Sequence, residues 1–373
     1  TAKFSFMEQW KEYKLGDISN MKYGKLPPKQ NNGSYPIWSG YRNVGFATTY
    51  NCRKGTIIVV ARGVGGTGDV KISSEDCFLT NLSIAVELDN KICEPLYFYY
   101  KYKLSNLRYL DTGSAQSQIT IDDLKRLSLK LPPLEEQKRI TEILSSIDYK
   151  IELNRRINDN LEQQAQALFD HYFDSGSIYL EDSIMGCLTD IAVYLNGLAM
   201  QKFPATDIER SLPVLKIKEL GQRKCDDCSD RCSDSIDADY IIDNEDIIFS
   251  WSGTLMVDVW CGGKCGLNQH LFKVTPLKNY PRWFVYYWTN RHLKKFKLIA
   301  KDKAVTMGHI RRGDLENAEV AIPTNLNMLE INARINPLFQ SIIDRRLEIT
   351  KLENIRDALL PKLMSGELTI NEI

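Results

Sequence analysis

The sequence lacks any uninterrupted apolar run of the ~20 residues that a membrane-spanning helix requires. Its first residues, Thr1 to Gly16, are charged and contain no apolar signal-peptide core. Both absences argue against a membrane or secreted protein, and we expect a soluble chain located in the cytoplasm. Hydrophobic residues make up 43% of the 373 residues, which is enough for ordinary globular cores.

Motifs of several catalytic classes are missing as well. The chain has no Walker A loop, no Asn or Asp followed by Pro-Pro-aromatic as in amino-methyltransferases, and no His-Glu-x-x-His zinc helix. It has only four histidines. His270 and His309 lie in expected loops and are suited to contact a ligand, but neither has a Ser or Cys partner at a recognisable spacing. The sequence therefore predicts a chain with no catalytic residues and no cofactor of its own.

Glycines at Gly63 to Gly68 spell GxGxxG after an expected strand, and Glu87 follows 19 residues later. A dinucleotide site requires a helix to begin at these glycines, so that its N-terminus meets the pyrophosphate. The next residues, Asp69 to Ser74, are too β-branched and too few for that helix. We favour a tight turn that presents Arg62.

Cysteine spacing raises the alternative of a structural zinc. Two groups have spacings that zinc sites use: Cys225, Cys228 and Cys232, then Cys261 and Cys265. The first group is crowded by aspartates, the second by glycines, and the first half of the chain has no counterpart. Reduced thiols are the default interpretation, and zinc stays open.

Charge is unevenly distributed although the net charge is zero. Residues 1–133 carry an excess of basic residues and 134–176 an excess of acidic ones, while residues 282–312 hold nine basic residues and one acid, Asp302. Such segregation favours a basic face on a neutral body. A solvated helix face is an equally good interpretation of the run at 291–303.

An internal repeat is the main feature that the sequence does have. An offset of 191 superimposes two apolar series with heptad spacing. The pairs are Ile140/Ile331, Leu144/Ile335, Ile147/Leu338, Ile151/Ile342, Leu161/Leu352 and Leu168/Leu359. A long helix with one narrow apolar stripe cannot bury it alone. We therefore expect two long helices that pack together as an antiparallel coiled coil.

The repeat extends into the regions before each helix. Corresponding segments are Asp17-Ile18 and Asp190-Ile191, Ile57-Ile58 and Ile247-Ile248, PLYFYY at 95–100 and PRWFVY at 281–286, and ITIDDL at 119–124 and IRRGDL at 310–315. This predicts an α+β chain with pseudo-two-fold duplication: mixed α/β domains at 1–131 and 177–322, and long helices at 132–176 and 323–373. We expect strands at 56–61, 82–88, 246–251 and 271–275, and further helices at 96–107 and 283–296.

Three segments carry a family resemblance beyond the duplicated plan. They are Leu131 to Gln137 (LPPLEEQ) leading into Lys138-Arg139-Ile140, Gly113 to Gln116 (GSAQ) before Ile119, and Leu360 to Glu367 (LPKLMSGE). With them, essentially the whole chain resembles the DNA-specificity subunit of Type I restriction-modification systems. The second helix departs from the pattern, because Thr324 to Asn327 replaces the acidic-Gln signature; the sequence therefore defines its start only to within a few residues.

The resemblance implies a non-catalytic reader of double-stranded DNA. Each domain would be a target-recognition domain for one half of a bipartite, asymmetric site. The helix pair would set the spacer and dock two modification subunits, which bind S-adenosylmethionine and methylate adenine; restriction subunits that use ATP and Mg would join them. Helices of about 40 residues span ~60 Å, more than the ~34 Å of one duplex turn.

Loop residues near the basic faces are the candidates for DNA contact. Arg42 and Arg62 suit guanine, Gln116 and Gln118 suit adenine, and Ser114 and Ser117 suit base edges or phosphates. The second domain offers Ser252, Thr254, Thr306, His309, Arg311 and Arg312. The alternative for each is a polar turn residue or a phosphate contact without specificity.

The two helices differ at equivalent positions of the stripe, where a symmetric coil would place apolar residues: Asn154 corresponds to Arg345, and Ala165 to Arg356. Polar residues weaken a coiled coil but fix its register and partner. We expect both arginines to set the antiparallel register by reaching acids on the first helix or on a docked subunit. Alternatively, their stems cover the stripe while their charged ends reach water.

Two other functional classes remain to be compared with a DNA reader. A fused methyltransferase and reader would need the missing cofactor motifs. A duplicated carbohydrate- or protein-binding scaffold would account for the six Trp and eighteen Tyr residues. Its binding would ignore salt, whereas phosphate contacts weaken as salt rises.

Overall fold

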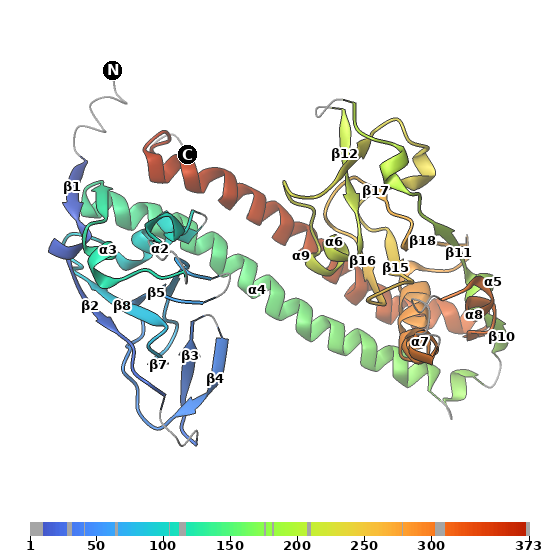
Figure 1. Cartoon of the computed structure of the whole chain (residues 1–373). Helices are drawn as coiled ribbons and strands as arrows, with labels where there is room; N and C mark the ends of the chain where they lie inside the picture. Colours follow the sequence, from blue (N-terminus) through green and yellow to red (C-terminus); the bar gives the residue numbers. More distant parts are fainter. Residues whose placement is uncertain are drawn as a thin grey trace. The chain divides into compact units, whose positions relative to one another are not determined.

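The structure, a computed structural model, describes residues 10–27, 32–40, 42–63, 66–103, 105–111, 117–174, 177–180, 183–206, 210–277, 279–302 and 310–370. The chain divides into two compact units: unit 1 comprises 1–149 and 353–373, and unit 2 comprises 150–352. Each unit contains part of both long helices, α4 (Leu134–Phe173) and α9 (Asn325–Ser365) (Figure 1). In the described part of the chain, no helix has the length and apolarity to cross a membrane.

Unit 1 is built on two small sheets and a two-stranded ribbon. The four-stranded sheet has the antiparallel order β2-β8-β5-β6, formed by Ser19–Tyr23, Ser83–Leu88, Ile57–Val60 and Val70–Ile72. The three-stranded sheet has the order β4-β3-β7, formed by Arg42–Ala47, Tyr35–Ser39 and Phe78–Leu79. The ribbon pairs β1 (Lys11–Lys14) with β9 (Ser128–Leu131), immediately before α4.

Unit 2 repeats this plan. Its antiparallel sheet has the order β11-β18-β15-β16, formed by Ala192–Asn196, Leu271–Pro276, Ile247–Ser250 and Met256–Val259. The second sheet has the order β13-β12-β17-β14, formed by Arg231–Ser233, Ser211–Leu215, Cys265–Leu267 and Ile241–Ile242. The ribbon pairs β10 (Ile184–Cys187) with β19 (Glu319–Ile322), before α9.

The duplication holds at the level of single hydrogen bonds. In unit 1, Gly24 N–H donates to the Ser83 carbonyl, and in unit 2 Gly197 N–H donates to that of Leu271, both at 3.0 Å. Side chains are impossible at both glycines, because a Cβ on Gly24 would collide with the Thr80 carbonyl and one on Gly197 with that of Asn268. The predicted α+β duplication is therefore confirmed, while the proposed four-part boundaries stay a prediction.

The shorter helices occupy the predicted segments but end elsewhere: the helix expected at 283–296 continues to Asp302, and the one expected at 96–107 ends early. Helices α2 (Pro95–Lys103) and α7 (Arg282–Asp302) occupy equivalent places, as do α3 (Ile121–Lys125) and α8 (Arg312–Glu316). The helix expected to reach Leu107 ends at Lys103. Asn106 adopts a left-handed backbone with φ of 44°, and Leu107 N–H donates to the Gly68 carbonyl at 2.8 Å. That long-range bond, which the local apolar pattern cannot reveal, redirects the chain.

The two long helices pack antiparallel in both units. In unit 1 the shared core contains Ile140, Leu144, Leu360 and Leu363. In unit 2 it contains Phe169, Ile331, Ile335 and Phe339. Of the twelve predicted stripe residues, Ile140, Leu144, Ile151, Ile331, Ile335 and Ile342 are buried, and the other six are half-buried. The start of α4 thus lies against the end of α9, and the end of α4 against its start.

Gln137 explains why the first helix begins with LPPLEEQ. Its fully buried amide accepts from Glu94 N–H and donates to the carbonyls of Ile92 and Pro132, each at 2.9 Å. At the equivalent position of α9, Met328 packs against the core of unit 2 instead. An apolar contact replaces the hydrogen-bonded amide, so the second helix does not need the motif.

Candidate nucleic-acid interface

Arg62 and Gln118 are brought together at one end of the main sheet of unit 1. Ala61, after β5, donates its N–H to the Leu82 carbonyl at 2.8 Å and accepts from Ile119 N–H at 2.9 Å. These bonds place Arg62 opposite Gln118 in an antiparallel bridge. Directly opposed residues project their side chains to the same side. A guanidinium fork and an amide therefore stand next to each other, the pair of groups that suits guanine beside adenine.

The Gln118 segment is held by Asp111. The Asp111 carboxylate accepts from the backbone N–H of Gln118 at 2.8 Å and from the hydroxyl of Ser117. Ser117, a predicted DNA contact, thus uses its proton inside the loop and keeps only acceptor capacity. The other two candidates of this loop, Ser114 and Gln116, lie outside the described residues.

Arg42 lies at the neighbouring hairpin of unit 1. It is the exposed first residue of β4 and pairs in register with Ser39. Gly40, in the turn between them, has φ of 61°, and a Cβ there would lie 3.8 Å from the Arg62 carbonyl oxygen. The hairpin tip and the Arg62 loop therefore share one end of the unit, so Arg42 and Arg62 can act on one ligand.

Unit 2 uses the same backbone scaffold at residues 251, 270 and 310. Trp251 N–H donates to the His270 carbonyl at 3.3 Å, and Ile310 N–H donates to the Trp251 carbonyl at 3.1 Å. These bonds match those of Ala61 with Leu82 and Ile119. Two of the three side chains differ, because Trp251 and His270 stand where unit 1 has Ala61 and Leu82, while Ile310 matches Ile119.

Ser252 and His270 form a pair that the sequence did not reveal. The hydroxyl of Ser252 lies 2.9 Å from His270 Nδ1, so His270 does have a serine partner, 18 residues away along the chain. Ser252 is only 4% exposed, whereas His270 is half-buried. The serine therefore orients the ring, and the imidazole is the more accessible polar group. A DNA contact by Ser252 itself stays a prediction.

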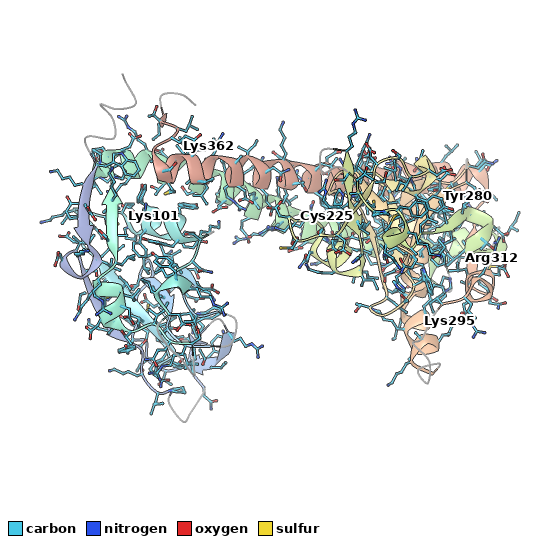
Figure 2. The ribbon with its side chains drawn as sticks, turned by 45° about the horizontal axis from the view of Figure 1, so that its top comes forward. Lys101, Cys225, Tyr280, Lys295, Arg312 and Lys362 are labelled. Atoms are coloured by element: carbon cyan, nitrogen blue, oxygen red, sulfur yellow. The ribbon has the colours of Figure 1, made fainter. Side chains whose placement is uncertain are left out.

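The remaining candidates of unit 2 lie around these loops. Thr254 is exposed after Gly253, which has φ of 62°. Arg311 and Arg312 are exposed at the start of α8; Arg312, labelled in Figure 2, lies 3.4 Å from Glu316 in a surface ion pair of little energetic weight. Thr306 and His309 lie outside the described residues.

Two hollows flank the His270 loop. One, of about 650 Å³, is lined by the aromatic side chains of Tyr194, Trp251 and Phe272 and also by Arg312. Trp251 lies 5.7 Å from Phe272 between ring centroids and donates its Nε1–H to Asn196 at 2.8 Å. The other, of about 440 Å³, is polar and is lined by Lys216, Arg231, Asn268, Gln269 and His270. The run Asn268-Gln269-His270, between two strands, is the signal that could have identified this loop.

The cysteines do not assemble into one metal site. Cys232 packs with Met200, Cys261 belongs to the main core of unit 2, and Cys265 lies in a third apolar cluster beside Cys225. Cys228 is exposed. Throughout the described ranges, no three His, Cys, Asp or Glu side chains are grouped as metal ligands would be.

The glycine-rich segment is not followed by a helix. Strand β6 follows Gly68, where a dinucleotide motif requires a helix.

Polar groups interrupt the apolar contact of the helix pair. In unit 1, Arg356 donates to Asp148 at 2.8 Å, as predicted for an acid on the first helix; Lys103 and Tyr100 donate to the same carboxylate at 2.8 and 2.9 Å. Burial works to raise the pKa of Asp148, but these donors lower it below the ordinary value. In unit 2, Arg345 reaches not an acid but the Asn154 amide oxygen, at 3.2 Å. Glu348, on the same helix as Arg345, accepts from the Asn154 amide nitrogen at 2.8 Å. An acid on a docked subunit as the partner of Arg345 stays a prediction.

Arg346, which sequence analysis missed, is the most buried charge of the helix pair. It is 8% exposed and donates to Asp258 at 2.5 Å and to Glu162 at 2.7 Å. It lines a hollow of about 640 Å³ together with Asp159, Glu162, Tyr286 and Phe339. Burial raises the pKa of Tyr286 to about 12. The carboxylates of Asp159, Glu162 and Asp170 line this hollow beside the aromatic rings. Such a lining is suited to a protein partner with basic side chains.

Comparison with known proteins shows which family the chain is similar to. The model of the Type I restriction modification DNA specificity domain matches residues 7–163 and again residues 185–356. The Type I restriction enzyme MjaIX specificity subunit of Methanocaldococcus jannaschii is 26% identical, over 97% of this chain and 89% of that protein. The HindI specificity subunit of Haemophilus influenzae is 52% identical over 15% of this chain and 12% of its own.

A solved structure shares the fold. The crystal structure of the Type I restriction-modification system S subunit from M. genitalium superimposes with a TM-score of 0.66 at 17% identity, covering 95% of this chain and 96% of that one. At this identity the similarity concerns the fold alone. The family model, however, covers most of the sequence, once in each half. The chain therefore belongs to the Type I restriction-modification DNA specificity family.

Proposed function

We propose that the chain is the DNA-reading subunit of a Type I complex and that each unit reads one half of a bipartite, asymmetric site. The observation that carries this is the repeated loop scaffold. Identical backbone bonds hold Ala61 and Ile119 in unit 1, and Trp251 and Ile310 in unit 2, while the neighbouring side chains differ. One scaffold with two side-chain sets suits two readers of two different half-sites.

The second part of the proposal concerns the pair of long helices. Helices α4 and α9, of 40 and 41 residues, would set the unread spacer and dock two modification subunits. Chemistry would reside in those partners, which would bind S-adenosylmethionine, while ATP and Mg would serve restriction subunits. The acidic hollow around Arg346 supports a protein contact on this surface. This chain would supply binding, orientation and spacing.

Co-expression with the modification subunits of the same system tests the proposal. The full chain should co-purify with them, and sequencing of adenine methylation should show two specified blocks separated by unspecified bases. Exchanging residues 1–131 for those of a relative should then change one block and leave the other intact. A change in both blocks, or methylation that does not depend on this chain, would refute the modular reader.

A further inference from the structure

Helix α7 extends beyond its counterpart in unit 1. Helix α2 has 9 residues and α7 has 21. Because PLYFYY aligns with PRWFVY, the end of α2 at Lys103 corresponds to Thr289. Residues 290–302 are thus a helical extension that belongs to unit 2 alone; we call them the α7 extension.

The α7 extension is basic, and its four described lysines form no ion pair with any described carboxylate. Lys294, Lys295, Lys297 and Lys301 are all exposed. No carboxylate of the described residues lies within ion-pair distance of these four ammonium groups. Arg291 differs, since it pairs with Asp174 at 2.5 Å. Lys294, Lys297 and Lys301 follow the i, i+3, i+7 spacing of one helix face.

Core contacts fix where this basic face lies. Phe296 is fully buried, and its ring stacks on Phe249 of β15 with centroids 5.8 Å apart. Two residues after Phe249 comes Trp251, where the candidate DNA loops begin. Lys301 lies ~7.5 Å further along the helix axis than Phe296. The extension therefore continues past the sheet at the end that carries Trp251, Ser252 and His270, and Figure 2 shows it projecting beyond Lys295.

We propose that the α7 extension binds the phosphate backbone of the duplex beside the half-site that unit 2 reads. This inference rests on the proposed function. A row of unpaired ammonium groups next to base-reading loops matches a polyanion with one charge per ~1.7 Å of axis. Phosphate contacts position a protein but carry no sequence information. The α7 extension therefore adds affinity and salt dependence to the DNA binding of unit 2, without specifying additional bases.

The triple variant Lys294→Gln, Lys297→Gln and Lys301→Gln tests the assignment in the full chain assembled with its modification subunits. Its affinity for a duplex with the methylation motif should fall at 0.1 M salt by roughly 8-fold for each lysine that binds a phosphate in the wild type, and the slope of log affinity against log salt should shrink by about 0.9 for each such lysine. The methylated motif should stay the same. The triple Lys→Arg variant should keep the wild-type slope.

A matched control is Lys264→Gln, compared with Lys297→Gln alone. Lys264 is exposed in the same unit, but it follows Gly263, whose N–H donates to Asn244 at the opposite end of the sheet. Only the Lys297 change should lower the slope. An unchanged slope of log affinity against log salt in the folded triple variant overturns the inference but leaves the proposed function intact. So does a triple variant that fails to assemble with its subunits but keeps the normal salt dependence, because the lysines would then form a protein-binding face. A wild-type complex without specific DNA binding would refute both.

Discussion

Arg62 and Gln118 face the same side of one backbone bridge in unit 1, and Ser252 and His270 pair at the corresponding place in unit 2. The sequence could indicate Arg62, because it follows a β-branched strand and precedes glycines. It could not indicate the pairing, since bridge partners far apart in sequence are set by long-range register. The histidine in particular lacks a local motif, and only the fold brings it to a serine.

Removing the Arg62 and Gln118 side chains should relax recognition in one half-site only. A bidentate contact to a base discriminates by about 1–3 kcal/mol, so Arg62→Ala and Gln118→Ala should each lower discrimination at one position of that block. Competition binding with single-base variants of the site measures this. Lys91→Ala, an exposed charge removal after the far end of β8, serves as the control. Equal relaxation in both blocks would contradict the assignment.

Asp148 should stabilise unit 1 in a pH-dependent way. Its folded pKa is below the ordinary 3.8, so its contribution is present above that value and disappears as pH falls through the folded pKa. At pH 7, Asp148→Asn should cost roughly 1–3 kcal/mol, because three donors are deprived of a charged acceptor. Urea unfolding from pH 7 to pH 3 should show the gap to wild type shrinking below about pH 4.

The control for Asp148 lies on the same helix. Glu142 is exposed on α4, and Glu142→Gln removes an equal charge from unit 1. Its effect should stay within about 0.5 kcal/mol at every pH. A constant gap between Asp148→Asn and wild type down to pH 3 would show that the carboxylate charge is not what stabilises the contact.

At the scale of elements, strands were predictable and helix ends were not. Strands β5, β8 and β15 fall within the predicted segments, and β18 extends only one residue beyond its segment, because β-branched runs bounded by Gly, Asn or Asp carry the signal locally. The early end of α2 depends on the long-range bond from Leu107 to Gly68. The apolar stripe predicted the helix pair. The contact between the Asn154 amide and Arg345 could not be predicted, because it depends on how the two helices are aligned.

Replacing both stripe arginines should separate stability from register. Arg356 donates to Asp148, and Arg345 is half-buried, with a buried Nε atom that has no hydrogen-bond partner. An unpartnered buried donor costs free energy, so Arg345→Leu with Arg356→Leu should not unfold the chain. We expect heterogeneous assembly with the modification subunits, measured by native mass spectrometry alongside thermal unfolding. Greater stability with normal assembly and an unchanged methylation motif would reject the register role.

At the scale of the whole molecule, two units with separate cores share two continuous helices. Each core takes apolar residues from both helices, Leu144 and Leu360 in unit 1 and Phe169 and Ile335 in unit 2. Cutting either helix would therefore expose apolar surface in both units. The duplicated sequence predicted this plan, whereas the place where one unit ends and the other begins, at Tyr149 and Leu352, came only from the contacts.

Those boundaries are the best positions at which to test whether helix length sets the unread DNA spacer. Repeat-equivalent insertions after Asn158 and Ile349 would cut through unit 2, where Asn158 contacts the Ile342 carbonyl. Insertions after Tyr149 and Leu352 instead fall between the contact of Asp148 with Arg356 and that of Lys150 with Glu348.

One heptad added at both boundary points keeps the apolar stripe in phase and lengthens the pair by ~10 Å. At 3.4 Å per base pair, the unread spacer of the methylated motif should grow by about three base pairs while both specified blocks stay the same. Adding the heptad to α4 alone, the control, should abolish assembly, because the stripe then has no matching partner. A complex that assembles with two heptads but methylates sites with the original spacer would show that the helices do not set the distance.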